Sequence, residues 1–198
     1  MNVITLTDVS RLQALSVLRW ELLLGLPRIV GTVEWELRAS ARTNRDLGTH
    51  LASWVRSCGQ PFPLDQHRLR TRRLAHAARR ADPLGHLGMT VERAVVARLR
   101  ADDEPACEAH LRAVLETSAH YLETRNRLLL LGLPLVDAAL RSTPGRGDVE
   151  QDAFQDGILG LMEALETYEP MSCAGFEEVA RSTVRARVCT LFAATSAA

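Results

Sequence analysis

The stretch DAFQDGILGLMEALETYEP, Asp152 to Pro170, carries the pattern that decides the fold. Its apolar residues recur at spacings of three and four, which predicts an amphipathic helix. Two glycines, Gly157 and Gly160, lie near the middle, and each costs about 1 kcal/mol relative to alanine in a helix interior. On a helical wheel they form a stripe of small residues with Ala164, so we expect a neighbouring helix to approach closely there.

The residue patterns on the two other sides of this helix predict that one side faces the core and the other faces solvent or a partner. One side carries an apolar stripe that we expect to face the core, made of Phe154, Ile158, Leu161, Leu165 and Tyr168. The third side carries Asp152, Gln155, Asp156 and Leu159, with Met162 and Glu163 at its edges. Acids near a helix N-terminus interact favourably with the helix dipole. Asp152 and Asp156 are therefore open to a purely structural interpretation as well as to a functional one.

Helical periodicity continues through almost the whole chain, and strand-like alternation is absent, so the sequence predicts an all-α fold. We expect Thr90 to cap a helix and the tryptophans Trp20, Trp35 and Trp54 to lie in the core. The expected helices cover residues 8–37 with a break or kink at Leu24–Pro27, 46–57, 67–80, 90–100, 104–124, 127–141 with a break or kink at Gly132–Pro134, 149–168 and 175–192.

Composition narrows the class of protein. The 198 residues carry no net formal charge, and every basic residue is arginine, but residues 132–198 hold five arginines against ten acids. The four cysteines show no pairing-like spacing, and we see neither a leader nor an apolar run long enough to cross a bilayer. These features predict a cytoplasmic protein with free thiols and no membrane partner.

Several short motifs carry little functional signal. We find no phosphate-binding loop, nucleophile elbow or catalytic carboxylate pair, so we expect neither an enzyme nor a cofactor. Cys107-x-x-His110, with His120, lacks the second close pair of a structural zinc site, so we expect no metal. The arginine-rich His67–Arg80 is open to binding nucleic acid or an acidic protein face, although a solvated helix face is the simpler interpretation. The tripeptide Arg146–Asp148 is a loop sequence without further meaning.

The helix from Asp152 onward matches a longer pattern of acids, glycines and apolar residues. Its members are Asp152, Gln155, Asp156, Gly157, Gly160, Leu161, Met162, Ala164, Tyr168, Glu169 and Pro170. This pattern resembles region 2 of bacterial sigma factors of the sigma-70 family. The resemblance continues upstream through LVDAALR (135–141) and Arg146-Gly147, and downstream through Phe176, Ala180, Val184 and Arg185, so that it covers about residues 132–188. Thr90–Leu111 resembles the family's preceding segment.

The resemblance implies a division of the chain and a partner. Residues 90–198 would form a sigma-region-2-like helical bundle, preceded by a helical portion, residues 1–89, of unknown role. In the family, the polar face of the second helix docks on the coiled-coil clamp helices of the RNA polymerase β′ subunit. By resemblance Asp152, Gln155, Asp156, Leu159 and Met162 would make those contacts. Ile158 replaces the family's usual asparagine, which indicates either an altered partner surface or a core residue.

The next helix departs from the family where promoter DNA is opened. The family's base-trapping tyrosine and tryptophans are replaced by Val179, Ser182 and Thr183, and its basic loop pair by Ser172 and Gly175. Glu177 and Glu178 add repulsion against phosphate, which leaves Arg181, Arg185 and Arg187 as weak DNA contacts. The chain ends soon afterwards, so we expect any promoter-reading module to come from a second polypeptide and promoter DNA to be met only within the polymerase complex.

Two functions follow as hypotheses. The first is a sigma-factor-like transcription regulator that binds RNA polymerase and lacks a complete DNA-melting and promoter-reading apparatus. The second is a helical protein–protein adaptor with a sigma-like fold that does not bind polymerase and works through its N-terminal half.

Overall fold

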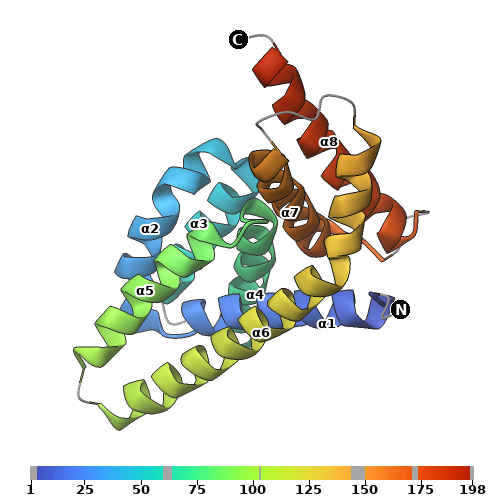
Figure 1. Ribbon diagram of the computed structural model, residues 1–198. Coiled ribbons are helices and arrows are strands. Elements are labelled where there is room, and N and C mark those ends of the chain that lie inside the picture. Colours follow the sequence, from blue (N-terminus) through green and yellow to red (C-terminus); the bar gives the residue numbers. More distant parts are fainter. Residues whose placement is uncertain (1–3, 60–63, 103, 144–149, 171–173, 197–198) are drawn as a thin grey trace. The chain divides into compact units, whose positions relative to one another are not determined.

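The computed structural model describes residues 4–59, 64–102, 104–143, 150–170 and 174–196. Within these ranges the chain forms eight α-helices and one short 3-10 helix and contains no strand (Figure 1). The prediction of an all-α fold is therefore confirmed. None of the described helices combines the length and the apolar character that crossing a lipid bilayer requires.

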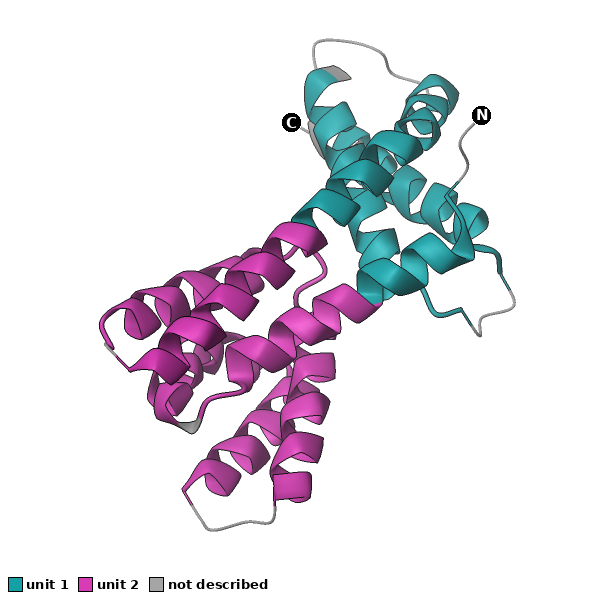
Figure 2. Ribbon diagram, turned by 90° about the horizontal axis from the view of Figure 1, so that it is seen from below, with its two compact units in different colours: residues 1–13, 122–198 teal, residues 14–121 magenta. Residues whose placement is uncertain are grey.

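Contacts divide the chain into two compact units (Figure 2). Unit 1 comprises residues 1–13 and 122–198, and unit 2 comprises residues 14–121. Two helices, α1 (Leu6–Leu24) and α6 (Pro105–Ser142), contribute residues to both units. This grouping by contact differs from the division at residue 89, which rests on resemblance between sequences.

Unit 2 surrounds a core that contains two of the three tryptophans, Trp20 and Trp54. The indole Nε1 of Trp54 donates a hydrogen bond of 3.2 Å to Thr71 Oγ1, so the polar end of this buried ring is satisfied. Between the second and third helices, Asn44 adopts an extended backbone and its side chain accepts a hydrogen bond from the Leu47 N–H, which caps the third helix. The elements of unit 2 are the end of α1, η1 (Pro27–Ile29), α2 (Val30–Thr43), α3 (Arg45–Cys58), α4 (Leu64–Ala81), α5 (His86–Arg100) and the start of α6.

Unit 1 consists of the start of α1, the end of α6, α7 (Glu150–Thr167) and α8 (Phe176–Ser196). Helices α7 and α8 lie side by side and make the most extensive helix-to-helix contact of the described chain (Figure 1). Near the turn between them, the rings of Tyr168 and Phe176 meet edge to face with centroids 5.5 Å apart. The Tyr168 hydroxyl donates a hydrogen bond of 3.3 Å to the Ala174 carbonyl, which fixes the entry into α8.

Of the predicted break or kink near Gly132–Pro134, the break is wrong, because α6 continues through both residues to Ser142, and the kink stays a prediction. Proline at position 134 removes the intrahelical hydrogen bond to the Leu130 carbonyl. The Leu130 side chain is 68% exposed and Pro134 is exposed, so this interruption falls on the solvent side of the helix. The same hexapeptide, LLLGLP, ends α1 at Leu22–Pro27, so its six residues alone do not determine a helix end.

Two further predictions about unit 2 are wrong. Trp35 is 71% exposed, because α2 buries the side that carries Val33 and Leu37. Thr90 does not cap a helix: α5 begins four residues earlier, after Gly85 in a left-handed conformation (φ 78°), and the Thr90 hydroxyl donates to the His86 carbonyl at 3.1 Å. Glycine adopts that backbone conformation without steric cost.

Some predictions concern residues outside the described ranges. The tripeptide Arg146–Asp148, Ser172 and Cys173 belong to this group. The described cysteines, Cys58, Cys107 and Cys189, form no disulfide, which agrees with the prediction of free thiols.

Candidate functional site

Helix α7 is held in unit 1 by its stripe of small residues. A Cβ atom on Gly160 would lie 2.9 Å from the Cα atom of Val184, so the backbones of α7 and α8 are in direct contact there. A Cβ atom on Gly157 would lie 2.5 Å from the Val136 Cγ1 atom of α6. Both glycines and Ala164 are buried. The predicted role of the small stripe is confirmed, and close packing accounts for glycine inside this helix.

The core side of α7 agrees with the predicted apolar stripe over its second half. Leu161, Leu165 and Tyr168 are buried, whereas Phe154 and Ile158 at the start are half-buried. The apolar side of α7 is therefore more deeply buried towards the C-terminus of the helix, and its first turns are more exposed to solvent.

All five residues predicted to bind polymerase lie on one side of α7, which we call the α7 polar face: Asp152, Gln155, Asp156, Leu159 and Met162. The structure brings them together because their spacings of three and four match the helical period. Asp152 and Gln155 are exposed, and the other three are half-buried. The face thus offers two exposed polar groups at its N-terminal end and two apolar side chains within reach of a partner.

A groove of about 380 Å³ runs between this face and α8. Asp156 and Glu163 border it from α7, and Arg187 borders it from α8, together with Thr183, Ala186 and Thr190. The Arg187 Nε atom donates to Glu163 Oε2 at 3.0 Å, and both side chains are about one-third exposed. Asp156 therefore borders the same groove as the ion pair between Arg187 and Glu163, which joins α8 to α7 next to the α7 polar face.

The three arginines predicted to contact DNA lie on α8 but have different surroundings. Arg187 is engaged by Glu163, as described above. Arg181 pairs with Glu177 at 2.7 Å across one helical turn, and both side chains are more than half exposed. Arg185 is exposed and pairs with no acid in the described part of the chain. Exposed ion pairs contribute little to stability, so Arg181 and Arg185 are more accessible to an external anion than Arg187 is.

The hydroxyl groups at the positions of the lost aromatics are occupied within α8. Ser182 Oγ and Thr183 Oγ1 both donate to the Val179 carbonyl, each at 2.9 Å. Ser182 is exposed, whereas Val179 and Thr183 are half-buried. None of these side chains carries a ring on which an unpaired base could stack.

Comparison with protein-family models, with curated proteins and with solved structures finds no match to this chain.

Sequence reasoning missed the residue that closes the end of α7. The Gln13 side-chain amide of α1 donates to the carbonyls of Leu165 at 3.0 Å and Tyr168 at 2.8 Å, which are orphan acceptors of the last turn. Glu166, on the same side of the helix as the α7 polar face, is buried. The face is therefore limited to the first three turns of α7. No signal near residue 13 indicated this contact, because it joins residues more than 150 positions apart.

The described residues include one cluster with metal-ligand chemistry, and it differs from the pair considered in the sequence. Side-chain ligand atoms of Asp102, Glu104 and Cys107 lie within 4.8 Å of one another. Arg28 Nη1 pairs with Glu104 and lies 3.3 Å from Asp102 Oδ2 and 3.4 Å from Cys107 Sγ. The hydrogen bond that Arg28 donates to the Glu104 carboxylate raises the Arg28 pKa above its usual value. A guanidinium thus already supplies the positive charge at this cluster.

The two histidines of the discounted motif lie apart from that cluster. A ring nitrogen of His110, Nε2, is 2.8 Å from the Leu22 carbonyl, which fixes α6 against the end of α1. His120 is exposed. The Cys107-x-x-His110 spacing therefore corresponds to a packing contact of His110.

Proposed function

We propose that this chain is a sigma-factor-like transcription regulator that binds the β′ clamp helices of bacterial RNA polymerase through the α7 polar face and acts in transcription initiation in the cytoplasm. The observation that carries the proposal is the ungapped match of Asp152–Pro170 to the sigma-70 region 2 pattern. The exposure of Asp152 and Gln155 on one continuous helix supports it, because those side chains are accessible to a partner.

The chemistry of the face suits a basic helical partner. Carboxylates form strong, directional bonds with arginine, and charge complementarity sets register and association rate. Leu159 and Met162 are half-buried, so they can add apolar contact at the centre of such an interface without destabilising the unbound protein.

The proposed regulator would depend on other components for promoter opening. The α8 positions of the base-trapping aromatics hold Val179, Ser182 and Thr183, and Arg187 is paired with Glu163. We therefore propose that promoter DNA is contacted only within the polymerase complex, and that a second polypeptide supplies a promoter-reading module.

Binding to isolated β′ clamp helices tests the proposal. We expect the full-length chain to bind them with a Kd of tens of micromolar or tighter, and the double variant Asp152→Arg/Asp156→Arg to lose binding while keeping its helix content. The matched control is Glu116→Arg/Glu123→Arg, which makes the same change in charge at two exposed positions of α6. Absence of binding by the wild-type chain, or equal loss in the control, would refute the proposal.

A second candidate function is a helical protein–protein adaptor, and the exposure of Trp35 favours it. A tryptophan that is 71% exposed is unusual on a free surface and frequent at interfaces. Deletion of residues 1–89 is unsuitable for comparing the two functions, because Val9 and Leu12 are buried in unit 1 and Gln13 caps α7. The substitution Trp35→Ser in the full-length chain is the better comparison: it should spare binding to the clamp helices if the first function holds.

A further inference from the structure

Helix α4 presents a basic outer face that the proposed function does not use. Its 18 residues include six arginines and one acid, Asp65. The opposite side packs into the core of unit 2 through Thr71, Leu74, Ala75, Ala77 and Ala78. Because that side is filled by small and apolar residues, the arginines are distributed over the sides and the outer surface of the helix.

Neighbouring helices neutralise only part of this charge. Arg80 pairs with Asp46 of α3 at 2.6 Å, and Arg72 lies 3.7 Å from Glu21 of α1 and is 69% exposed. Arg68 and Arg73 are exposed and pair with no acid among the residues that the structure describes. The His76 pKa is lowered, first by burial and then by Arg79, Arg72 and Arg80, which agrees with a positive potential over this face.

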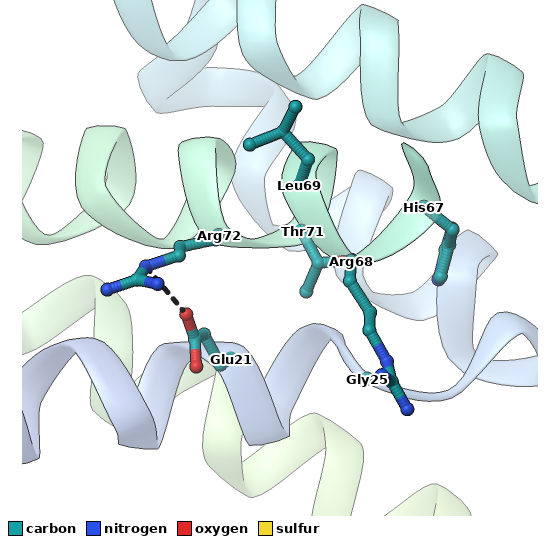
Figure 3. Close-up of a pocket in the computed structure, with 7 residues that line it drawn as sticks. All are labelled: Glu21, Gly25, His67, Arg68, Leu69, Thr71 and Arg72. Carbon is teal, nitrogen blue, oxygen red and sulfur yellow. Dashed lines mark ion pairs between the residues drawn. The ribbon is translucent and has the colours of Figure 1, made fainter. Parts of the chain in front are cut away.

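A groove of about 570 Å³ lies beside these arginines, between α4 and α1. Arg68, Thr71 and Arg72 extend from α4 towards α1, where Glu21 and Gly25 form the other wall, whereas Leu69 points away (Figure 3). Gly25 contributes only backbone to that wall, next to Arg68 in this view (Figure 3). The groove is partly open to solvent, which suits a polypeptide segment better than an enclosed small molecule.

The groove offers hydrogen-bond acceptors as well as donors. Glu21 contributes a carboxylate to the wall of the groove, beside Arg68 and Arg72. A phosphodiester backbone has acceptors only, whereas an acidic peptide supplies carboxylates for Arg68 and Arg72 and backbone N–H groups for Glu21.

We propose that the α1–α4 groove, with the arginines of α4, binds an acidic polypeptide segment of a partner protein. Carboxylates of the segment pair with Arg68 and Arg72, whose planar guanidinium groups accept them in bidentate geometry. The exposed Leu69, at 50% exposure, gives an apolar side chain of the partner a contact next to this groove. This inference concerns unit 2 alone and does not depend on the α7 polar face.

Fluorescence polarisation with the full-length chain tests the proposal. The probe is a labelled peptide rich in glutamate with interspersed leucine, and the comparison probes are the same peptide with lysine in place of glutamate and a single-stranded oligonucleotide. We expect binding of the glutamate peptide only, and a loss of affinity of at least about tenfold for Arg68→Ala/Arg72→Ala, since the variant removes two charge-assisted contacts. The matched control Arg93→Ala/Arg98→Ala removes two exposed arginines of α5 and should leave affinity unchanged.

A charge-swapped variant tests the proposal in a way that a loss of protein stability cannot imitate. The variant Arg68→Glu/Arg72→Glu should reject the glutamate peptide and bind the lysine peptide, which a misfolded protein would not do. The proposal is overturned if the oligonucleotide binds more tightly than the glutamate peptide, if the peptide binds equally well to the groove and control variants, or if the lysine peptide fails to bind the charge-swapped chain. Self-association of the wild-type chain that the groove variant abolishes would also overturn it, by assigning the groove to a second copy.

Discussion

Gly160 of α7 lies against the backbone of Val184 on α8, where a Cβ atom at position 160 would be 2.9 Å from the Val184 Cα atom. The same Cβ atom would be 3.2 Å from the Thr183 carbonyl oxygen. Because these neighbours are backbone atoms, they cannot move aside by a change of rotamer. The distance between α7 and α8 therefore depends on this glycine.

We predict opposite effects of alanine at two helical glycines. Gly160→Ala should destabilise the chain by about 1–3 kcal/mol, because the cost of overpacking exceeds the gain in helix propensity. Gly31→Ala in α2 should stabilise it by up to about 1 kcal/mol, since a Cβ atom there meets nothing within 4 Å. Urea denaturation of both variants measures this. A stabilised Gly160→Ala variant would contradict the packing described for α7 and α8.

Helix periodicity predicts the features of this fold that are local in the chain. The helical content and the small stripe of Gly157 and Gly160 follow from spacing alone. The continuity of α6 across Pro134 does not, because packing of Val136 against Gly157 of α7 overrides the local cost of proline. The exposure of Trp35 could not be predicted from the sequence either. An apolar side chain on a helical face is expected to be buried, and only the packing of α2 shows which side faces the core.

The candidate site shows the same division. The side of α7 that carries Asp152 and Gln155 follows from the helical period, and the structure leaves both residues exposed. The pairing of Arg187 with Glu163 and the cap from Gln13 depend on how α8 and α1 pack against α7. Contacts of this kind join distant positions, and a single sequence contains no local pattern that specifies them.

Removal of one partner from the buried Arg19–Glu92 pair should lower the free energy of unfolding more than removal of both partners. Arg19 Nη2 lies 2.7 Å from Glu92 Oε2, and the two side chains are 5% and 20% exposed. Ser118 Oγ donates to the same oxygen at 2.6 Å, and Arg19 lies over the Tyr121 ring. Glu92→Leu leaves a buried guanidinium without its carboxylate, which costs about 3–5 kcal/mol.

The double variant Arg19→Met/Glu92→Leu removes both charges and should recover a large part of that loss. The free energy of unfolding of the two single variants and the double variant forms a double-mutant cycle. Additive losses would show that the two charges do not interact in solution.

Substitutions of Gln13 should destabilise the end of α7. Gln13→Leu removes two hydrogen bonds to orphan carbonyls, at about 1 kcal/mol each. Gln13→Glu has nearly the same shape but at neutral pH places a carboxylate against carbonyl oxygens at the negative end of the helix dipole, so it should be the less stable variant. Protonation of the glutamate restores one donor, so the difference between the two variants should shrink at low pH. Denaturation at pH 7 and at low pH, with the leucine variant as control, measures this.

Asp82 should make the stability of the folded chain depend on pH. Burial raises the Asp82 pKa above the usual aspartate value of 3.8, although its carboxylate accepts a hydrogen bond of 2.6 Å from the Gly88 N–H at the start of α5. A carboxyl whose pKa is raised by folding favours the folded state at low pH, and this contribution is lost as pH increases from 3.8 through the raised pKa. Asp82→Asn keeps the acceptor without the charge.

The stability of Asp82→Asn relative to wild type should therefore increase from acid to neutral pH. Urea denaturation across that range measures it, with Glu116→Gln, at an exposed position of α6, as the control that should show a smaller change. A relative stability that falls with increasing pH would show that the Asp82 pKa is lowered by folding.

The last prediction concerns promoter DNA. We expect core polymerase with this chain as the only added factor not to open a −10-like element, because the α8 positions of the base-trapping aromatics carry no ring and the hydroxyls of Ser182 and Thr183 are bonded to the Val179 carbonyl. Of its arginines, Arg187 is held by Glu163, and the segment 132–198 carries twice as many acids as arginines, which disfavours phosphate contacts.

Fluorescence of a base analogue in the −10 element measures opening, with and without candidate partner polypeptides. The variant Ser182→Trp/Thr183→Trp restores two rings that can stack on unpaired bases, at about 1–3 kcal/mol per base, and should increase any opening that a partner permits. The matched control Thr190→Trp places one ring at an exposed position further along α8 and should not. Opening by core polymerase and the wild-type chain alone would show that this helix opens DNA without aromatic stacking. Opening only when a partner is added would indicate a sigma factor divided between two chains, and no opening under any condition would indicate a competitor of sigma factors.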